Sequence, residues 1–419
     1  MKINMPSTPV FINFATIMDT PIPEGFKEMI RQMPGIDGEA LIAALDTDPS
    51  VSIKLNRRKL GDITKAEAEK ILGYTGLEPV PWCPSGFYIP ERPPFTLNPL
   101  LHAGAFYVQD ASSMIYEQLV SEYCSDMAPG LALDMCAAPG GKSTSMLNAL
   151  HDGWTLVSNE FMPQRAGILR ENLLKWGYPR IVVTNNDTAR FGEAGETFDL
   201  VAVDAPCSGE GMMRKEEAAR AQWSPRLIRQ CAQLQRDILT NAVNSLLPGG
   251  VLIYSTCTFN RSENEDNVKW AAEQFGLDVL HHRRFMPHIS RGEGLFVAVL
   301  RKEGTSAHQK NSRKILDRVL KKCRVVTDGF PPPALKGRDL VPDASAPLSL
   351  DFDANKYPSI EVELETALEY LRHNPITLPS DTPRGLAVIT YRGQRLGMVK
   401  NLGTRANNLY PKEWRIRNL

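Results

Sequence analysis

The chain has 419 residues, of which 42% are hydrophobic, and its 48 Lys and Arg balance 48 Asp and Glu. At roughly 150 residues per domain this length predicts two or three domains, and the composition is that of a globular protein rather than a disordered one. No apolar run approaches the roughly 20 residues that cross a bilayer, and the first residues lack a signal-peptide pattern. We expect a cytoplasmic protein with no membrane partner.

The seven cysteines are odd in number, scattered, and include no C-x-x-C pair. This usage excludes a disulfide framework and a zinc cluster, so we expect no metal site. A functional cysteine in this chain should work as a free thiol.

The first hundred residues mix helical patterns, such as PEGFKEMIRQM, with short strand-like runs, such as SIKLNRR. They end in the Pro-rich PERPPFTLNP, which is typical of a connector. We predict a small α+β domain over residues 1–100.

Residues 101–302 alternate apolar strands with amphipathic helices, which indicates an α/β domain with a mostly parallel, doubly wound sheet. The expected strands are 131–136, 154–160, 180–187, 198–206 and 251–258, followed by two late strands in LDVLHH and GLFVAVLRK. The expected helices are 142–150, 163–176, 225–247 and 262–275.

Residues 303–345 are basic and Pro-rich, and we predict a linker with one helix in RKILDRVLKKC. Residues 346–419 indicate a compact, mainly β module with one helix. Positive charge gathers at both places, with nine Lys/Arg against two Asp/Glu over 301–324 and seven against one over 392–417. This segregation is compatible with local nucleic-acid contacts, and equally with a solvated surface.

The first strand is followed by CAAPGGKSTSM, from Cys136 to Met146. In a doubly wound sheet, ligands bind at the carboxyl ends of the strands, and adjacent glycines allow a ligand to approach the backbone closely. The GGKST tail imitates a P-loop, but that motif requires glycine where Cys136 stands. A phosphate-binding P-loop is therefore the lesser interpretation.

Acidic residues end the next two strands. Glu160 is placed to accept hydrogen bonds from the ribose hydroxyls of an adenosine, and Asp187 to reach an adenine amino group. Either acid alone is also a common helix cap. Together with the glycine loop they predict an adenosyl cofactor across the strand ends.

The fourth strand ends in Asp204-Ala-Pro-Cys207, and the fifth is followed directly by Cys257. If these strands are neighbours, the two thiols face one crevice. Core packing is the usual role of a lone cysteine, but two in adjacent strand-end turns favour chemistry. The residues alone leave open which thiol attacks.

The motifs LDMCAAPGGKST, DAPCSGEGMMRK and YSTCTFNRSENEDNV resemble the signatures of the NSUN family of S-adenosylmethionine-dependent RNA cytosine-C5 methyltransferases. The resemblance extends upstream to SIKLNRRK and HAGAFYVQDASSM, and downstream to GEGLFVAVLRK. The last residues, RGQRLGMVKNLGTRANNLYPKEWRIR, are similar to the RNA-binding tail of the bacterial branch that modifies small-subunit ribosomal RNA. This implies a Rossmann-like class I methyltransferase domain and a PUA-like C-terminal module.

The resemblance also implies roles for residues. Cys257 would be the nucleophile, Cys207 would assist release of the product, and Asp204 would bind the cytosine and the methionine end of the cofactor. Glu160 would bind the ribose and Asp187 the adenine, while Arg165 would support the cofactor-side helix. The methionine and sulfonium portion would lie on Cys136, Ala137, Ala138, Pro139, Gly140, Gly141 and Lys142.

The implied partner is RNA, either 16S ribosomal RNA or the small ribosomal subunit, and no obligate protein partner is indicated. The implied cofactor is S-adenosylmethionine, which leaves as S-adenosylhomocysteine. Two alternatives remain open: a transfer RNA cytosine-C5 methyltransferase, and a non-catalytic RNA-binding assembly factor that keeps the fold. The intact cysteine pair and cofactor loop count against the second.

Overall fold

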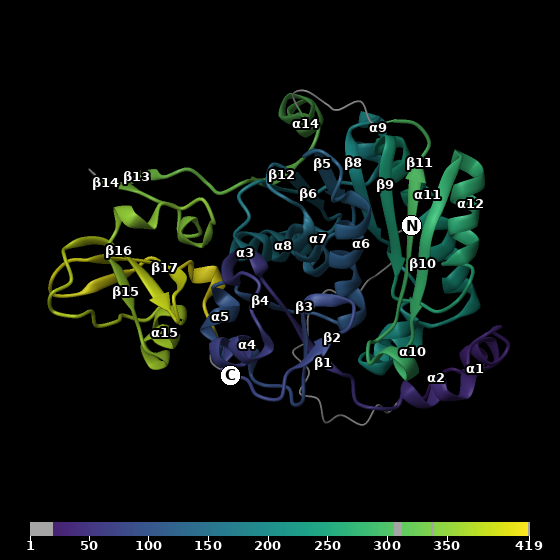
Figure 1. Cartoon of the computed structure of the whole chain (residues 1–419), viewed down its shortest axis with the longest axis horizontal. Helices are drawn as coiled ribbons and strands as arrows, with labels where there is room; N and C mark the ends of the chain where they lie inside the picture. The colour runs from purple at the N-terminus through teal and green to yellow at the C-terminus, as the bar shows by residue number, and fades with distance from the viewer. Residues whose placement is uncertain (1–19, 306–311, 337–338, 418–419) are drawn as a thin grey trace.

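The computed structural model describes residues 20–305, 312–336 and 339–417. At its centre lies an eight-stranded sheet with the strand order β10-β11-β9-β8-β5-β6-β7-β12 (Figure 1). Its strands are β5 (Leu131–Asp134), β6 (Thr155–Asn159), β7 (Ile181–Thr184), β8 (Phe198–Asp204), β9 (Leu246–Thr256), β10 (Leu277–Phe285), β11 (Leu295–Lys302) and β12 (Val325–Asp328). The pairs within β5 to β9 are parallel, whereas β10, β11 and β12 join antiparallel. The predicted doubly wound, mostly parallel sheet is confirmed.

Helices cover both faces of this sheet because successive strand residues point to opposite sides. One core joins Ala132, Leu200 and Ile253 to α6 (Ile115–Cys124), α7 (Gly141–Ala149) and α8 (Pro163–Trp176). The other joins Leu133, Val201 and Leu252 to the helices of the opposite face. These are α9 (Ala189–Ala194), α11 (Pro225–Ser245), α12 (Glu265–Phe275) and α14 (Ser312–Leu320).

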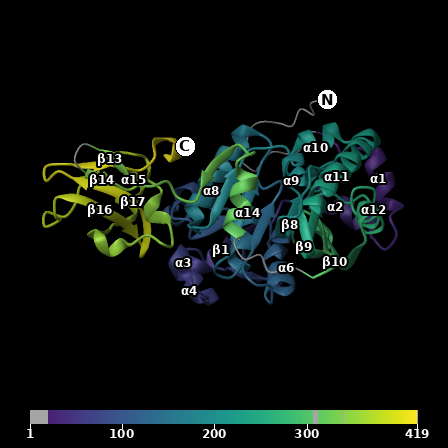
Figure 2. The same ribbon diagram turned by 90° about the horizontal axis from the view of Figure 1, so that it is seen from above.

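The first hundred residues lie in two parts rather than in one. The sheet β2-β3-β1-β4 is antiparallel and packs beside the α7 and α8 face. It contains β1 (Val51–Leu55), β2 (Glu78–Val80), β3 (Cys83–Ile89) and β4 (Phe106–Val108), with α3 (Arg57–Leu60), α4 (Lys65–Leu72) and α5 (Pro99–His102) around it. By contrast, α1 (Glu24–Arg31) and α2 (Gly38–Ala44) lie near α10 (Glu217–Gln222), away from that sheet (Figures 1 and 2).

The packing of α1 explains this separation. Phe26 and Ile30 are fully buried and join a core with Trp223 and Phe259, which lie beyond β8 and β9 in the chain. The rings of Phe26 and Trp223 meet edge to face at 5.8 Å between centroids. The N-terminal helix therefore supports the cysteine loops from behind.

The segment expected to be a linker contains α14, as predicted, and also β12. β12 pairs with β7, so this segment extends the central sheet. The short strands β13 (Ala334–Lys336) and β14 (Asp339–Val341) follow as a hairpin.

The C-terminal module is a four-stranded sheet, β15-β16-β17-β18, with one helix, in agreement with the predicted mainly β module. Its elements are β15 (Ser359–Glu361), β16 (Gly385–Tyr391), β17 (Gln394–Asn401), β18 (Ala406–Asn408) and α15 (Leu364–Leu371). It lies at one side of the molecule, next to the first sheet's helices (Figure 1). Arg392 Nη1 donates to the carbonyl of Ile71 at 2.7 Å across this boundary. Within the described ranges, no helix is long and apolar enough to cross a membrane.

Candidate active site at the strand ends

The loop from Cys136 to Lys142 connects β5 to α7 at the carboxyl edge of the sheet. Gly140 has φ of 115°, in the left-handed region that favours glycine, and a Cβ there would come within 3.3 Å of Leu169 Cδ1. The backbone N–H of Ala137 donates to the carbonyl of Asn159 at 2.8 Å. The loop is thus fixed to the neighbouring strand, with the free N–H groups of the start of α7 at its end.

Asp134, the last residue of β5, lies beneath this loop. It is buried, and Ser143 Oγ donates to its Oδ2 at 2.6 Å, while its Oδ1 has no hydrogen-bond partner among the described residues. Burial raises the pKa of Asp134 to about 7. Burial also raises the pKa of Cys136 well above its ordinary value, so this cysteine stays a thiol.

Glu160 and Arg165 form a clamp on the glycine loop, residues 136–142. Glu160 is buried, its Oε1 accepts the Met162 N–H at 2.7 Å, and its Oε2 lies 3.3 Å from Arg165 Nη1. The same guanidinium donates from Nη2 to the carbonyl of Ala138 at 2.6 Å. Arg165, predicted only as a support of the cofactor-side helix, therefore joins the acid of β6 to the glycine loop.

Asp187 follows β7 and is exposed. Its Oδ1 accepts the Ala189 N–H at 2.9 Å, so its carboxylate is engaged at the start of α9. Asn159 links the same strand ends, because its Nδ2 donates to the carbonyls of Met135 at 3.2 Å and Asn186 at 3.0 Å. The sequence reasoning missed Asn159, although its position directly before Glu160 at the end of a strand was a signal for it.

The two cysteine loops meet. β8 and β9 are parallel neighbours with Asp204 opposite Ser255, and the sulfur atoms of Cys207 and Cys257 lie 3.3 Å apart. The predicted single crevice for both thiols agrees with this geometry. The hydrogen bond to Cys257, followed by burial, raises the pKa of Cys207 well above its ordinary value.

Asp204 joins the thiol side of the site to the cofactor loop. Its Oδ2 accepts a hydrogen bond from Lys142 Nζ at 2.8 Å, and its Oδ1 accepts one from Ser255 Oγ at 2.8 Å. Burial acts to lower the pKa of Lys142, but the charges of Asp204 and then Cys257 outweigh it and raise that pKa overall. The Lys142 cation therefore bonds to Asp204, and a negative charge on Cys257 would stabilise it further.

Family comparisons agree with this arrangement along most of the chain. Residues 127–301 match the family described as 16S rRNA methyltransferase RsmB/F, and residues 22–111 match the N-terminal domain of 16S rRNA methyltransferase RsmF. Residues 357–416 match the methyltransferase RsmF PUA domain. The chain belongs to the RsmB/F family.

Individual relatives carry the same family name. The chain is 37% identical over 309 residues to ribosomal RNA small subunit methyltransferase F of Pectobacterium atrosepticum, covering 68% of this chain and 63% of that protein. It is 34% identical over 306 residues to the Escherichia coli protein of that name, covering 67% of this chain and 63% of that one. The match thus spans less than two thirds of the length of these relatives.

Solved structures share the fold. A methyltransferase homolog from Pyrococcus horikoshii has a TM-score of 0.58 at 25% identity, covering 66% of this chain and 94% of its own. NSun6 from Pyrococcus horikoshii, solved with SFG, has a TM-score of 0.59 at 20% identity, covering 68% of this chain and 100% of its own. PH0851 has a TM-score of 0.61 at 24% identity, covering 67% and 66%.

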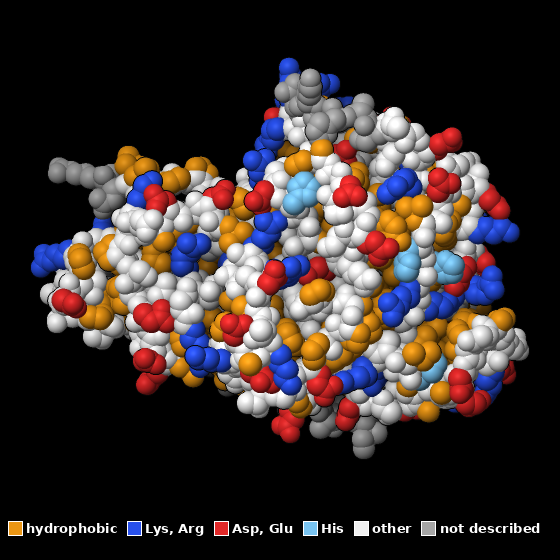
Figure 3. Space-filling model, in the orientation of Figure 1, with side chains coloured by type: hydrophobic (Ala, Val, Ile, Leu, Met, Phe, Trp, Pro, Cys, Tyr) orange, Lys and Arg blue, Asp and Glu red, His pale blue; other side chains and the backbone are white. Residues whose placement is uncertain are grey.

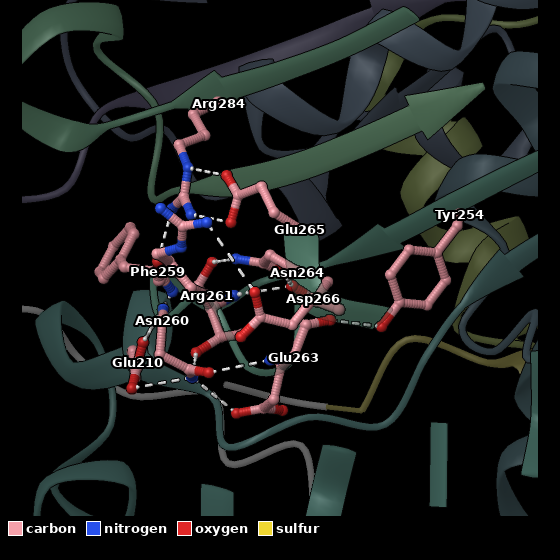
Figure 4. Close-up of polar contacts among 12 residues, drawn as sticks. Glu210, Tyr254, Phe259, Asn260, Arg261, Glu263, Asn264, Glu265, Asp266 and Arg284 are labelled. Atoms are coloured by element: carbon pink, nitrogen blue, oxygen red, sulfur yellow. Dashed lines mark hydrogen bonds and ion pairs between the residues drawn. The ribbon is translucent and has the colours of Figure 1, made fainter. Parts of the chain in front are cut away.

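Behind the thiols, this RsmB/F chain has a buried polar network that the sequence reasoning missed (Figure 4). Glu210 Oε2 accepts the backbone N–H groups of Phe259 and Asn260 at 2.7 and 2.9 Å. Asn260 Nδ2 donates to Glu263 Oε1 at 2.7 Å and to Glu210 Oε1 at 3.1 Å. The polar run NRSENEDN, residues 260–267, lies close after Cys257, but polarity alone does not distinguish a buried network from an exposed loop.

Proposed function

We propose that this protein transfers a methyl group from S-adenosylmethionine to carbon 5 of a cytosine in RNA, with 16S ribosomal RNA as the substrate. The observation that carries the proposal is the thiol pair, 3.3 Å apart, beside an aspartate that a lysine of the glycine loop contacts. The family to which the chain belongs is named for methylation of this RNA. A ribosomal RNA substrate would place the protein in the cytoplasm.

The strand ends fit an adenosyl cofactor. Gly140 leaves room beside Leu169 that a side chain would fill, and Asp134 Oδ1 is a buried acceptor without a partner in the described chain. The buried Glu160 would hold the ribose, Asp187 the adenine, and the segment from Cys136 to Lys142 the methionine portion. NSun6 was solved with SFG, an S-adenosylmethionine analogue, and shares this fold. When bound, the cofactor would supply an electrophilic methyl group.

Carbon 5 of cytosine becomes nucleophilic only after a nucleophile adds to carbon 6. The Cys257 thiolate would form that bond, with Asp204 positioned by Lys142 and Ser255 to bind the cytosine edge. After methylation of carbon 5, its proton passes to water as the bond between carbon 6 and the Cys257 sulfur breaks. Cys207, at 3.3 Å, would keep its proton and donate a hydrogen bond to the departing sulfur, which leaves as the thiolate that began the cycle.

An RNA partner is supported by charge as well as by the PUA match. Arg313 of α14 pairs with Asp317 and Asp328. Within the described part of the chain, five further exposed or half-exposed cations near it form no ion pair with an acid. They are Lys314, Arg318, Lys321, Lys322 and Arg324. Lys and Arg side chains gather where α14 lies at the upper edge of the molecule (Figures 1 and 3), as phosphate binding requires.

The test separates the two thiols. Cys207→Ser should accumulate a covalent protein–RNA adduct that survives denaturing electrophoresis, because Cys257 adds but is released slowly. Cys257→Ala should lose both the adduct and transfer of labelled methyl from S-adenosylmethionine. An adduct formed by Cys257→Ala would contradict the assignment.

The substrate is tested with the wild-type protein on naked 16S ribosomal RNA, purified 30S subunits and bulk transfer RNA. Methyl transfer to the ribosomal substrates supports the proposal, and transfer only to transfer RNA redirects it. Binding of RNA without transfer to any substrate would instead identify a non-catalytic factor.

A further inference from the structure

Two carboxylates lie fully buried behind the thiol pair without a cation. Glu210 and Glu263 have no exposed surface, and within the described residues neither forms an ion pair with Lys, Arg or His. Burying a carboxylate is costly unless hydrogen bonds replace its water. Both acids are instead supplied with donors from the cysteine loops and α11, as Figure 4 shows in part. Such an arrangement indicates a role in positioning those loops.

Glu263 contacts the Cys207 loop on both sides of the thiol. Its Oε2 accepts the N–H of Ser208 at 3.0 Å, and it accepts Gln235 Nε2 at 2.7 Å. The same Gln235 Nε2 donates to the carbonyl of Pro206 at 2.9 Å. The two residues that flank Cys207 are therefore both held, directly or through one amide, by one carboxylate.

The same carboxylate reaches the Cys257 loop. Glu263 Oε1 accepts Asn260 Nδ2 at 2.7 Å, and the Asn260 side-chain oxygen accepts the Glu263 N–H at 3.0 Å. Tyr254 of β9 donates its hydroxyl to the Glu263 carbonyl at 2.6 Å. Glu263 thus spans the two loops whose sulfur atoms meet at 3.3 Å.

The charges around the two thiols differ. A charge on Cys257 acts to raise the pKa of Lys142, whose Nζ bonds to Asp204, whereas the charge of Glu263 adds to the hydrogen bond to Cys257 and to burial in raising the pKa of Cys207. Burial raises the pKa of Glu263 to about 6, so it is mostly ionised at neutral pH. The titratable groups that face Glu263 are Glu210, Cys231 of α11, Tyr254 and Cys207, and none of them is a cation.

We propose that Glu263 is a positioning residue that holds the Cys207 loop against the Cys257 loop, so that Cys207 stays a thiol and donates to the Cys257 thiolate. The catalytic roles of the two cysteines rest on the proposed function. The difference in reactivity between the two thiols does not. It gives a physical reason for the division of labour between two cysteines in similar strand-end turns. The thiol beside a lysine attacks, and the thiol beside a carboxylate keeps its proton.

The test is the initial rate of iodoacetamide alkylation at each cysteine, mapped by mass spectrometry between pH 6 and 9 without cofactor or RNA. In the wild-type protein, Cys257 should react at least about tenfold faster than Cys207 at pH 7.5, because the thiolate is the reactive form. In Glu263→Gln, Cys207 should react about tenfold faster than in the wild type, which corresponds to a fall of one unit in its pKa.

Two further variants separate positioning from general damage. Glu263→Asp keeps the charge and should leave the Cys207 rate closer to wild type than Glu263→Gln does. Glu265→Gln removes a nearby carboxylate that pairs with Arg284 instead, and should leave both thiol rates unchanged. Circular dichroism and thermal unfolding establish that each variant is folded.

If Glu263→Gln does not fold, the ratio of the Cys257 and Cys207 alkylation rates in the wild-type protein decides alone. Faster alkylation of Cys207 than of Cys257 then overturns the inference. An unchanged Cys207 rate in a folded Glu263→Gln protein overturns it as well. Failure of the proposed function is a separate result: a protein that shows the thiol asymmetry but methylates no RNA keeps this inference and loses that function.

Discussion

Asp134 shows how the fold changes the chemistry of a single residue. It ends β5 beneath the cofactor loop, and burial raises its pKa from 3.8 to about 7. Between these pH values the folded protein holds a proton that the unfolded chain has lost. The contribution of Asp134 to the free energy of unfolding is therefore fully present below about pH 4 and is lost as the pH rises through 7.

We predict that Asp134→Asn removes this dependence. The free energy of unfolding of the variant minus that of the wild type should increase by on the order of 2 kcal/mol from pH 5 to pH 8. Urea unfolding at a series of pH values measures this difference. Asp152→Asn is the control, because that carboxylate is exposed. A difference that does not change with pH would contradict the burial of an ionisable group at this position.

At the scale of elements, α14 is more than part of a linker. The backbone N–H and carbonyl of Arg324, just after this helix, bond to Asn186 and Asn185 at 2.9 Å each, so the segment is fixed beside β7. An open groove beside it is lined by Lys314, Arg318 and Lys321 together with Asp317 and Asp328, which pair with Arg313. The basic surface therefore has a defined place near the strand ends.

We predict that replacing Lys314, Arg318 and Lys321 together with glutamate weakens binding of a 16S ribosomal RNA fragment. A plot of the logarithm of the binding constant against the logarithm of the salt concentration has a negative slope, and each phosphate contact contributes about 0.7 to 0.9 to its magnitude. The magnitude of the slope should therefore decrease by about 2. Filter binding at several salt concentrations measures both quantities. The matched control replaces Lys65, Lys269 and Lys356, which lie on other elements. An equal effect in the control would mean that net charge, not the α14 surface, is responsible.

At the scale of the whole molecule, the first sheet contacts the loop from Cys136 to Lys142 and α7 through Lys54. This β1 lysine has no exposed surface, and its Nζ donates to Gly141 O at 3.0 Å, Thr144 Oγ1 at 2.8 Å and Ser145 Oγ at 2.6 Å. It also contacts Gln109 Oε1 at 2.9 Å. The N-terminal sheet and the first turn of α7 are therefore one hydrogen-bonded unit.

We predict that Lys54→Met raises the dissociation constant for S-adenosylmethionine by about tenfold, or about 1.4 kcal/mol, because Gly141 and the start of α7 lose the hydrogen bonds that fix them. Isothermal titration calorimetry measures the constant directly. Lys59→Met is a matched control: burial lowers the pKa of both lysines to about 7, but Lys59 binds the carbonyls of Ala103 and Lys175 instead of α7. Equal losses of affinity in both variants would contradict a specific role for Lys54.

The local pattern of apolar and polar residues was sufficient to predict the central sheet and the position of the site at its edge. Apolar strand runs and amphipathic helices have different periods, so helix 163–176 and the positions of the strands along the chain could be predicted. Boundaries were less accurate: β9 begins at Leu246, not at Val251, because Leu246 pairs with Phe198 across the sheet. Short helices such as α9 were missed, since six residues show little periodicity.

By itself, the sequence determined that Cys207, Cys257, Asp204 and the glycine loop lie at one edge, because side chains after parallel strands meet there. Only the tertiary structure decided which partners these residues have. Arg165 could have been a solvated side chain, and it clamps Glu160 to Ala138. Lys54 is far in sequence from α7, and Glu263 is 55 residues from Ser208, so these contacts depend on packing and not on local pattern. That packing placed a cation by one thiol and a carboxylate by the other.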